Sequence, residues 1–367
     1  MRFRFLVDES SVQGAAWEYL SHDMREAHLS LLFRLYYGMR PFIPLGIRHR
    51  LQRHRPVTCG PNWFMPDTFI KTMCDAVGRG NSLPIIHPWP DNARFAFVLT
   101  HDVESSTGLK NIERIAAMEE ELGFRSSWNF VPHRYRIDMG LIADLQRRGF
   151  EIGVHGFNHD GRLYNSLREF RRRVPAMQRA LKKFGAVGFR SPMAHRNLDW
   201  LQALDIEYDS SCFDVDPYQP MPGGVGAVWP FMFGRFVELP YTLPQDHTLF
   251  VVRGECDAST WSRKLHFLSR TSGLALMLTH PDYLATDELR NVYRGFLEHV
   301  KCNEQYWHAL PIDVARWWQI RDATTMKLLS TGEWTITGPA PDRTSVSAID
   351  VDGDSLCLRL IQKTRAL

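Results

Sequence analysis

Residues 95–104 read Phe-Ala-Phe-Val-Leu-Thr-His-Asp-Val-Glu, an apolar run that ends in polar residues. The apolar part is typical of a buried β-strand, so the polar part falls at the C-terminal end of that strand. Side chains alternate between the two faces of a strand, which places Asp102 and Glu104 on one side and His101 and Val103 on the other. We therefore expect two carboxylates to point together from this strand, with two solvated acids as the ordinary alternative.

Two further apolar runs end in histidine. The first, Phe150-Glu-Ile-Gly-Val, is followed by His155 and, four residues on, by His159. A turn at that spacing brings both rings to one side of the chain, as a shared metal ion requires, although two surface histidines are the commoner explanation. The second run, Leu274-Ala-Leu-Met-Leu-Thr, ends in His280, which could donate a proton to a leaving group or be structural.

Strand-like and helix-like segments alternate from about residue 91 onward. The expected strands are 95–100, 127–131, 150–155, 186–190, 206–210, 236–241 and 274–280, and the expected helices are 109–122, 139–148, 166–184, 258–271 and 285–300. This alternation predicts an α/β fold in which seven parallel strands close into a barrel, with an open doubly wound sheet as the alternative. Parallel barrels gather their chemistry at the C-terminal ends of the strands. No Gly-x-Gly-x-x-Gly sequence follows a strand, so no dinucleotide site is expected.

The segments on either side of this pattern differ from it. Residues 1–90 are predicted to be largely helical and contain a basic stretch, and Pro88-Trp-Pro-Asp marks their end. In residues 321–367 several stretches alternate apolar and polar residues, with a turn signal at Asp352-Gly353. We therefore divide the chain into a helical, basic N-terminal extension (1–90), a barrel (91–320) and a small β-rich C-terminal appendage (321–367).

The basic stretch has an unusual composition. No acidic residue falls between Ala27 and Pro66, and leucine, phenylalanine, tyrosine and isoleucine lie among its arginines. These are Arg34, Arg40, Arg48, Arg50, Arg53 and Arg55. Such a segment permits peripheral contact of residues 29–55 with an anionic membrane surface. The alternative is that it packs on the barrel and exposes its arginines to water.

Composition narrows the classes of function. A net charge of +3 over 367 residues gives no argument for nucleic-acid binding. The six cysteines are scattered and include no Cys-x-x-Cys pair, which argues against a disulfide scaffold and suits a reducing compartment. Since neither a signal-peptide-like stretch nor an 18-residue apolar run is present, we expect a cytoplasmic protein, with any membrane association confined to the basic stretch.

Other polar residues lie where a site could use them. Arg190 ends an expected strand, and its permanent charge could hold a catalytic carboxylate ionised or form an ordinary salt bridge. Asp209 ends the next expected strand and could orient His280 if the two are neighbours. Further candidates in loops, which spacing does not rank, are Asp214, Asp216, Asp246 and His247.

In combination, these motifs resemble those of the polysaccharide deacetylases, carbohydrate esterase family 4 or the NodB-homology domain. The family's T-F-D-D, H-S/T-x-x-H, R-x-P and L-x-L-x-H motifs look like residues 100–103, 155–159, 190–192 and 276–280. The resemblance covers residues 91–320. It implies a distorted, incomplete (β/α)7 barrel that removes acetyl groups from sugars with a divalent metal. The family's phenylalanine in the first motif is His101 here, to which the sequence assigns no role.

One departure from the family pattern concerns the metal site. The family's second aspartate, a metal ligand, is Val103 here, whereas branches with a D-x-D or D-x-E motif place that ligand two residues further on, at Glu104 in this chain. Strand alternation also favours Glu104, because Val103 faces away. The resemblance therefore implies Glu104, His155 and His159 as metal ligands. It leaves Asp102 as the catalytic base, or as a ligand in the alternative assignment.

We expect this site to hydrolyse an acetamido sugar of a polysaccharide or a glycolipid. Asp102 would take a proton from water, and His280 would protonate the departing amine. Arg190 and Asp209 would support these catalytic groups. Zinc is the default metal for such ligands, with iron, cobalt and nickel as alternatives. The rival functions are a metal-dependent hydrolase of a formyl or ureido amide, and a catalytically silent carbohydrate-binding protein, which the valine at position 103 motivates.

Overall fold

The computed structural model describes residues 3–4, 10–23, 35–36, 39, 43–54, 56–219, 221, 224–303, 305–362 and 365–366. Within these residues, ten strands form the main sheet in the order β1-β8-β9-β7-β6-β5-β4-β3-β10, with β11 paired on β3. Their bounds are β1 Phe3–Arg4, β3 Phe95–Val103, β4 Ser126–Phe130, β5 Glu151–His155, β6 Gly188–Arg190, β7 Tyr208–Asp209, β8 Phe231–Phe233, β9 Phe236–Glu238, β10 Leu274–Thr279 and β11 Tyr306–His308.

The seven strands expected from the sequence form a continuous parallel run in this sheet, and β11 is also parallel to β3. They run in the order β9-β7-β6-β5-β4-β3-β10, and each neighbouring pair is parallel. The chain after β9 approaches the opposite edge, where an isolated bridge joins Leu243 to Met277 in β10. In the described part of the chain this bridge, rather than a strand pair, connects the two edges. The prediction of a distorted, incomplete (β/α)7 barrel is therefore confirmed.

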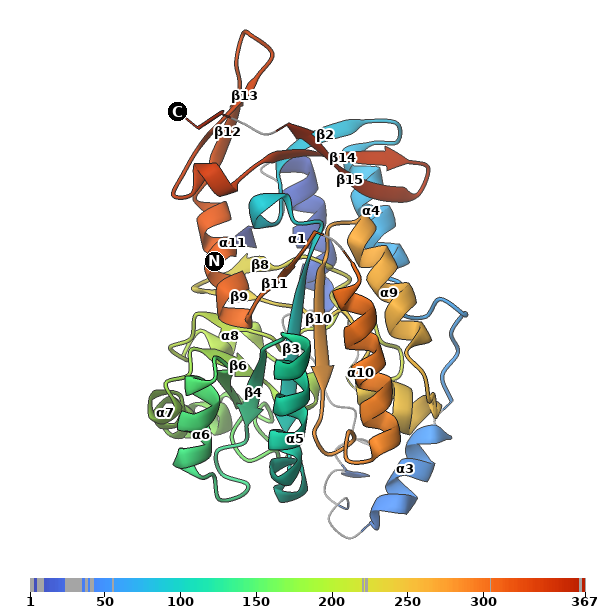
Figure 1. Cartoon of the computed structure of the whole chain (residues 1–367), viewed down its shortest axis with the longest axis vertical. Coiled ribbons are helices and arrows are strands. Elements are labelled where there is room, and N and C mark those ends of the chain that lie inside the picture. Colours follow the sequence, from blue (N-terminus) through green and yellow to red (C-terminus); the bar gives the residue numbers. More distant parts are fainter. Residues whose placement is uncertain are drawn as a thin grey trace.

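Helices cover the barrel strands on the outside (Figure 1). The bounds are α5 Ser106–Leu122, α6 Met139–Arg147, α7 Leu167–Phe184, α8 Leu198–Leu201, α9 Ser259–Arg270, α10 Asp287–Lys301 and α11 Pro311–Asp322. The five expected helices correspond to α5, α6, α7, α9 and α10. Sequence signals set the ends of α5, because the hydroxyl of Ser105 accepts two backbone N–H groups at its start and Gly123 is left-handed at its end.

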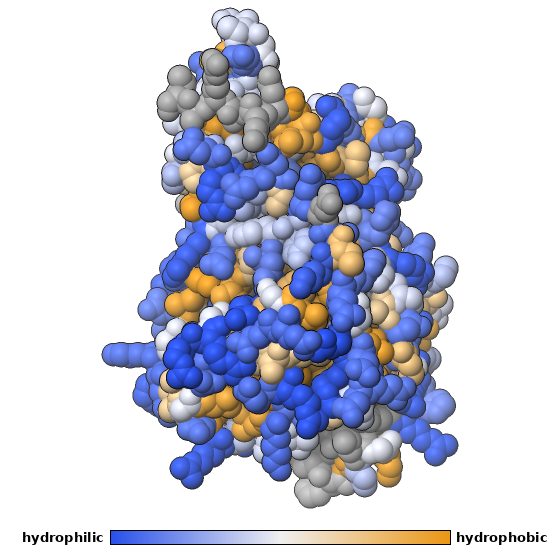
Figure 2. Space-filling model, in the orientation of Figure 1, coloured by the Kyte–Doolittle hydropathy of each residue, from blue (hydrophilic) through white to orange (hydrophobic). Residues whose placement is uncertain are grey.

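The core lies between the strands and these helices. All nine residues of β3 and all six of β10 are buried, as parallel strands covered on both faces require. The face seen in Figure 2 is mainly hydrophilic, with separate hydrophobic patches. These buried strands therefore hold in place the polar residues at their C-terminal ends.

The two extensions meet at one end of the molecule. The C-terminal hairpin of β14 (Val346–Asp352) and β15 (Ser355–Gln362) turns at Gly353, as the sequence predicted, and β14 also pairs with β2 (Ser82–Ile86). A second small sheet holds β12 (Thr325–Leu328), β13 (Trp334–Thr337) and β16 (Arg365–Ala366). Residues 82–86, assigned to the helical extension, are therefore a strand that covers an edge of the C-terminal hairpin. The domain boundaries at residues 90 and 320 stay a prediction.

The rest of the described N-terminal extension holds the strand β1, three α-helices and segments without regular structure such as residues 56–60. The helices are α1 (Ser10–Asp23), α3 (Leu45–Arg53) and α4 (Asp67–Val77). Figure 1 shows α3 at the opposite end of the molecule from β14 and β15. It contacts the π-helix η4 (His247–Arg253), where the Arg53 Nε–H donates to the Val251 carbonyl at 2.8 Å. Of the six arginines, Arg34, Arg40 and Arg55 lie outside the described residues. Within those residues, no helix combines the length and the hydrophobicity needed to cross a bilayer.

Candidate active site

The polar ends of three barrel strands meet at one cavity of about 520 Å³. Asp102 lies near the end of β3, which Glu104 follows, His155 ends β5, and His280 follows β10. These four residues line the cavity together with His159 and Arg190. Of the residues given a catalytic or metal-binding role from the sequence, Asp209 alone does not line the cavity. Of the unranked loop candidates, His247 lines it, whereas Asp214, Asp216 and Asp246 do not.

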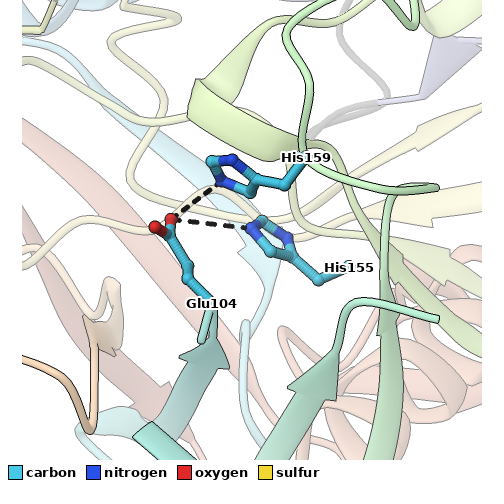
Figure 3. Close-up of side chains that lie close together, drawn as sticks. All are labelled: Glu104, His155 and His159. Carbon is cyan, nitrogen blue, oxygen red and sulfur yellow. Dashed lines mark ion pairs between the residues drawn. The ribbon is translucent and has the colours of Figure 1, made fainter. Parts of the chain in front are cut away.

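Glu104, His155 and His159 are close enough to share one ion. One potential ligand atom from each lies within 4.8 Å of the other two. The Glu104 Oε1 is 2.9 Å from the His159 Nε2 and 3.9 Å from the His155 Nε2. Figure 3 shows the carboxylate and the two rings converging from the ends of two strands and the loop after the second. Two imidazoles and one carboxylate are a common ligand set for a catalytic divalent metal.

The loop after β5 has the backbone needed to return His159 over His155. Gly156 has a φ of +64°, and a Cβ there would lie 2.5 Å from the ring of Pro192, so a glycine is required. His159 itself has a φ of 58°, in the left-handed region that non-glycine residues seldom occupy. The two rings end with their centroids 5.2 Å apart. Such local strain often occurs at functional sites, where surrounding contacts hold it.

The ring nitrogens are arranged as metal ligation requires. The Nδ1 of His155 lies 3.1 Å from the carbonyl of Arg190, which can only accept, so Nδ1 carries the proton and Nε2 presents a lone pair. The buried Nε2 of His155 and both ring nitrogens of His159 have no hydrogen-bond partner among the described residues. Buried polar atoms normally find a partner. A divalent cation among these groups would satisfy them.

The charge states of the group also fit a cation. Burial lowers the pKa of His159, which favours the neutral ring that binds metals. Burial raises the pKa of Glu104, but the electrostatic influence of the adjacent His159 and His155 rings outweighs it and holds this pKa well below its usual value. Glu104 is therefore an anion between two imidazoles.

Asp102 lies beside this group but has partners of its own. Its Oδ1 accepts from the Arg190 Nη1 at 3.0 Å and from the Asn129 Nδ2 at 2.9 Å. Its Oδ2 is 3.6 Å from the His155 Nε2. Burial raises the pKa of Asp102, but the electrostatic influence of the neighbouring His155 ring and the Arg190 guanidinium brings it below the usual value. Asp102 is thus an oriented anion within reach of the cavity, which suits a general base.

Asn129 was not singled out from the sequence. It lies in β4 directly opposite Gly153 of β5. A Cβ at position 153 would lie 1.9 Å from the Asn129 Oδ1, so the glycine makes room for the amide that binds Asp102. The available signals were an asparagine inside an apolar strand and a glycine inside the next one.

His280 is oriented by Asp246 and not by Asp209, which corrects our expectation. The Asp246 Oδ1 is 2.7 Å from the His280 Nδ1, and its Oδ2 accepts the backbone N–H of His280 at 2.6 Å. Burial lowers the pKa of His280, but the Asp246 carboxylate outweighs it and raises this pKa to about 10. The ring is therefore protonated at neutral pH, and its Nε2 lies 3.7 Å from the Glu104 Oε1. It has the charge state of a general acid.

Asp209 belongs to a buried cluster behind the cavity wall. Its carboxylate accepts from the Ser211 hydroxyl at 2.8 Å and from the backbone N–H of Ser211 at 3.2 Å. Burial and the neighbouring carboxyl of Glu238 raise the pKa of Asp209 well above its usual value. Ser211 lines the cavity, whereas Asp209 does not. The hydrogen bonds of Asp209 thus go to Ser211, two residues further along the chain, and not to His280.

The N-terminal extension supplies part of the cavity wall. Six of its residues line the cavity, namely Tyr36, Leu51, Gln52, His54, Pro56 and Val57. Barrel residues such as Met193, Tyr241 and Tyr283 line the same cavity. The cavity therefore has a charged floor at the strand ends and a wall that combines aromatic, aliphatic and amide side chains.

Comparison with known proteins identifies the fold. No family profile matches the sequence, and no curated protein matches it. The fold is similar to that of many solved chains, among them three crystal structures. One is described as a polysaccharide deacetylase from Mycobacterium smegmatis, with 19% identity, a TM-score of 0.54 and coverage of 64% of this chain and 93% of that chain. A second, described likewise, is from Pseudomonas aeruginosa PAO1, with 16% identity, a TM-score of 0.53 and coverage of 64% and 94%.

The third similar structure is the Puue allantoinase, with 17% identity, a TM-score of 0.52 and coverage of 64% of this chain and 93% of that chain. All three likenesses lie under 25% identity, so they show a shared fold. The chain has the fold of the polysaccharide deacetylases, as the NodB-like motifs implied.

Proposed function

We propose that this protein is a metal-dependent hydrolase that removes acetyl groups from N-acetylated sugars of a polysaccharide or glycolipid. The observation that carries the proposal is the convergence of Glu104, His155 and His159 on one point of a cavity that Asp102 and His280 also line. A site built only to bind a sugar has no need for a carboxylate and two imidazoles with unsatisfied ring nitrogens beside an oriented acid and an oriented base. The fold shared with polysaccharide deacetylases supports the same reaction class.

The residues of this chain divide the work of amide hydrolysis. Glu104, His155 and His159 would hold the cation, which would polarise the substrate carbonyl and acidify a water molecule. Asp102, kept anionic by Arg190 and oriented by Asn129, takes a proton from the attacking water. His280, kept cationic by Asp246, gives a proton to the departing amine nitrogen. The walls of the cavity exclude bulk water and orient the sugar.

A screen for released acetate tests this proposal. The purified chain is loaded with zinc and, in parallel, with iron, cobalt or nickel, and offered N-acetylated mono- and oligosaccharides and peptidoglycan fragments. We expect acetate release that a chelator abolishes and added metal restores. If no acetylated saccharide yields acetate with any of the metals, the deacetylase proposal is wrong.

A different amide is the second candidate, which the likeness to the Puue allantoinase favours. Allantoin and N-formyl sugars therefore join the screen. Hydrolysis of a ring amide opens allantoin to allantoate without releasing a fragment, so allantoate and formate are measured beside acetate. Turnover of one of these with none of the acetylated sugars would move the assignment to that amide. A catalytically silent carbohydrate-binding protein would instead take up no metal, so elemental analysis for about one ion per chain separates it from both enzymes.

We also propose that the N-terminal extension brings the cavity to an anionic membrane surface. Four apolar side chains of this extension are more than half exposed, namely Leu35, Met39, Ile47 and Leu51. Leu51 also lines the cavity, so exposed apolar surface continues into the site. Since residues 27–66 carry arginines and no acid, an anionic lipid surface is the matching partner.

Liposome co-sedimentation tests the membrane proposal. We expect the full chain to bind vesicles that contain acidic lipids, to lose binding in high salt, and to bind more weakly when Ile47 and Leu51 are both changed to glutamate. No binding by the unaltered chain would rule it out and leave a substrate free in solution. The cytoplasmic location stays a prediction from the sequence.

A further inference from the structure

His101 lies next to Asp102, but the proposed mechanism does not use it. Its side chain is fully buried and alternates with Asp102 along β3, so it points away from the cavity toward the covering helices. The ring stacks on Trp128, with centroids 4.2 Å apart and an angle of 27° between the planes. An apolar ring would fill this place equally well, so the polar atoms of the imidazole need an explanation of their own.

Both ring nitrogens of His101 have buried partners. Nε2 lies 2.7 Å from the Glu119 Oε1 on α5, and Nδ1 lies 2.7 Å from the Thr279 hydroxyl at the end of β10. The Glu119 carboxylate also accepts from the hydroxyls of Tyr293 on α10 and Ser126 on β4, both at 2.6 Å. Every member of this network is fully buried. The Glu119 carboxylate on α5 thus links this helix to α10 and to the strands β3 and β4. His101 extends this hydrogen-bond network to β10.

This hydrogen-bond network lies directly beside the two proposed proton-transfer residues, Asp102 and His280. His101 and Thr279 are register partners at the end of the β3–β10 pair. The residue after His101 on β3 is Asp102, and the residue after Thr279, directly beyond β10, is His280. Since adjacent residues share the backbone, the His101–Thr279 hydrogen bond fixes the positions from which Asp102 and His280 reach into the cavity.

We propose that His101, held between Glu119 and Thr279, is a positioning residue that sets Asp102 and His280 in register for proton transfer. This proposal rests on the roles assigned above to those two residues. A buried polar network costs desolvation that apolar packing avoids, so stability alone gives no reason for it. What it adds over an apolar core is one fixed arrangement of the two strand ends.

Matched substitutions on β10 and beside it test this role. Thr279→Val keeps the shape of the side chain and removes the hydroxyl that bonds to His101, whereas Thr279→Ser retains a hydroxyl. Thr242→Val removes a buried hydroxyl that donates to the Leu274 carbonyl at the far end of the same strand. We expect Thr279→Val to lower kcat about tenfold while KM stays within about threefold of the value for the unaltered chain. Thr279→Ser should retain most of the original kcat, and Thr242→Val should leave kcat unchanged.

A second readout does not depend on turnover. The Nδ1 proton of His280, hydrogen-bonded to Asp246, should give a downfield proton resonance that disappears in His280→Gln. We expect this resonance to shift or broaden in Thr279→Val and in Glu119→Gln, and to stay in place in Thr279→Ser and Thr242→Val. Glu119→Gln weakens the hydrogen-bond network at its other end. It replaces Thr279→Val as the test variant if Thr279→Val does not fold.

The two readouts separate failure of this role from failure of the proposed function. If Thr279→Val matches Thr242→Val in kcat and in the resonance, His101 is only a core residue and the positioning role is overturned. If the unaltered chain turns over no amide in the screen, the proposed function fails. The His280 Nδ1 proton resonance alone then decides whether the hydrogen-bond network positions His280.

Discussion

Asp246 holds His280 at two points, the ring and the backbone. Its Oδ1 is 2.7 Å from the His280 Nδ1, and its Oδ2 accepts the His280 backbone N–H at 2.6 Å. The same carboxylate accepts the N–H of His247 at 2.7 Å, where the π-helix η4 begins. The loop that shapes one wall of the cavity therefore also fixes the orientation and the charge of the proposed general acid.

Asp246→Asn should move the alkaline limb of the activity profile to lower pH. His280 acts as an acid only when protonated, and the Asp246 charge is what raises its pKa to about 10. Without that charge the pKa falls, so activity is lost at a lower pH, and kcat at neutral pH should drop at least about tenfold. The measurement is kcat/KM against pH with the best substrate of the screen. Asp209→Asn is the control, and an equal shift in that variant would contradict the assignment of Asp246.

Glu104 and Asp102 should differ in what their loss removes. Glu104→Gln takes away a proposed ligand, so we expect the affinity for zinc to fall by more than about tenfold. Asp102→Asn should still bind about one zinc per chain, because its carboxylate is occupied by Arg190 and Asn129, yet kcat should fall about 10²–10⁴-fold. Zinc titration against a chelator and acetate release are measured on both variants. Loss of zinc from Asp102→Asn to the same degree would make Asp102 a ligand.

The parallel strands and the main members of the site could be read from the sequence for local reasons. Apolar runs such as residues 95–100 have no other place than a buried strand, and the C-terminal ends of parallel strands share one rim. Alternation along β3 alone put Asp102 and Glu104 on the cavity side and His101 on the other. These predictions needed no knowledge of distant contacts.

The partners that orient these residues could not be read in the same way. Asp246 is 34 residues from His280 and precedes a π-helix that the spacing of apolar residues does not predict. Asp209 was preferred to it because it ends a strand, but β7 has only two residues and leaves its aspartate behind the wall. Strand β2 was missed because its partner β14 lies more than 250 residues further along the chain. Pairing over such distances depends on tertiary packing that local patterns do not contain.

Gly153→Ala should impair activity through Asn129. The new methyl group would overlap the Asn129 Oδ1, so the amide must leave Asp102 and the base loses one of its two orienting hydrogen bonds. We expect kcat to fall about tenfold while the zinc content is unchanged. Gly295→Ala on α10, where a Cβ meets nothing within 4 Å, is the matched control and should leave kcat unaltered.

A double variant tests the route of this effect. If Gly153→Ala acts only by displacing Asn129, adding it to Asn129→Ala should lower kcat no further than Asn129→Ala alone. Additive losses would mean that the methyl group disturbs β5 and His155 directly, and that the close approach of Gly153 and Asn129 has no separate role.

His87 should make the stability of the protein fall in mild acid. Its ring joins the two extensions to the barrel, because Nδ1 lies 2.7 Å from the Ser347 hydroxyl on β14 and Nε2 lies 2.8 Å from the Ala93 carbonyl just before β3. Burial lowers the pKa of His87 from 6.5 to about 4. Between these pH values the unfolded chain binds more protons than the folded chain. The free energy of unfolding should therefore fall by about 3 kcal/mol as the pH drops from 6.5 to 4.

Other histidines also titrate in this range, so the effect is isolated as a difference between variants. His87→Gln keeps an amide that can donate to the Ala93 carbonyl but has no proton to gain, and its unfolding free energy should lose that part of the pH dependence. Ser347→Ala should be less stable at every pH and keep the dependence, since the ring still titrates. Denaturant unfolding of the three proteins from pH 4 to 8 gives the comparison. If the unfolding free energies of His87→Gln and the unaltered chain changed with pH in parallel, the contact between the two extensions would not depend on a neutral His87.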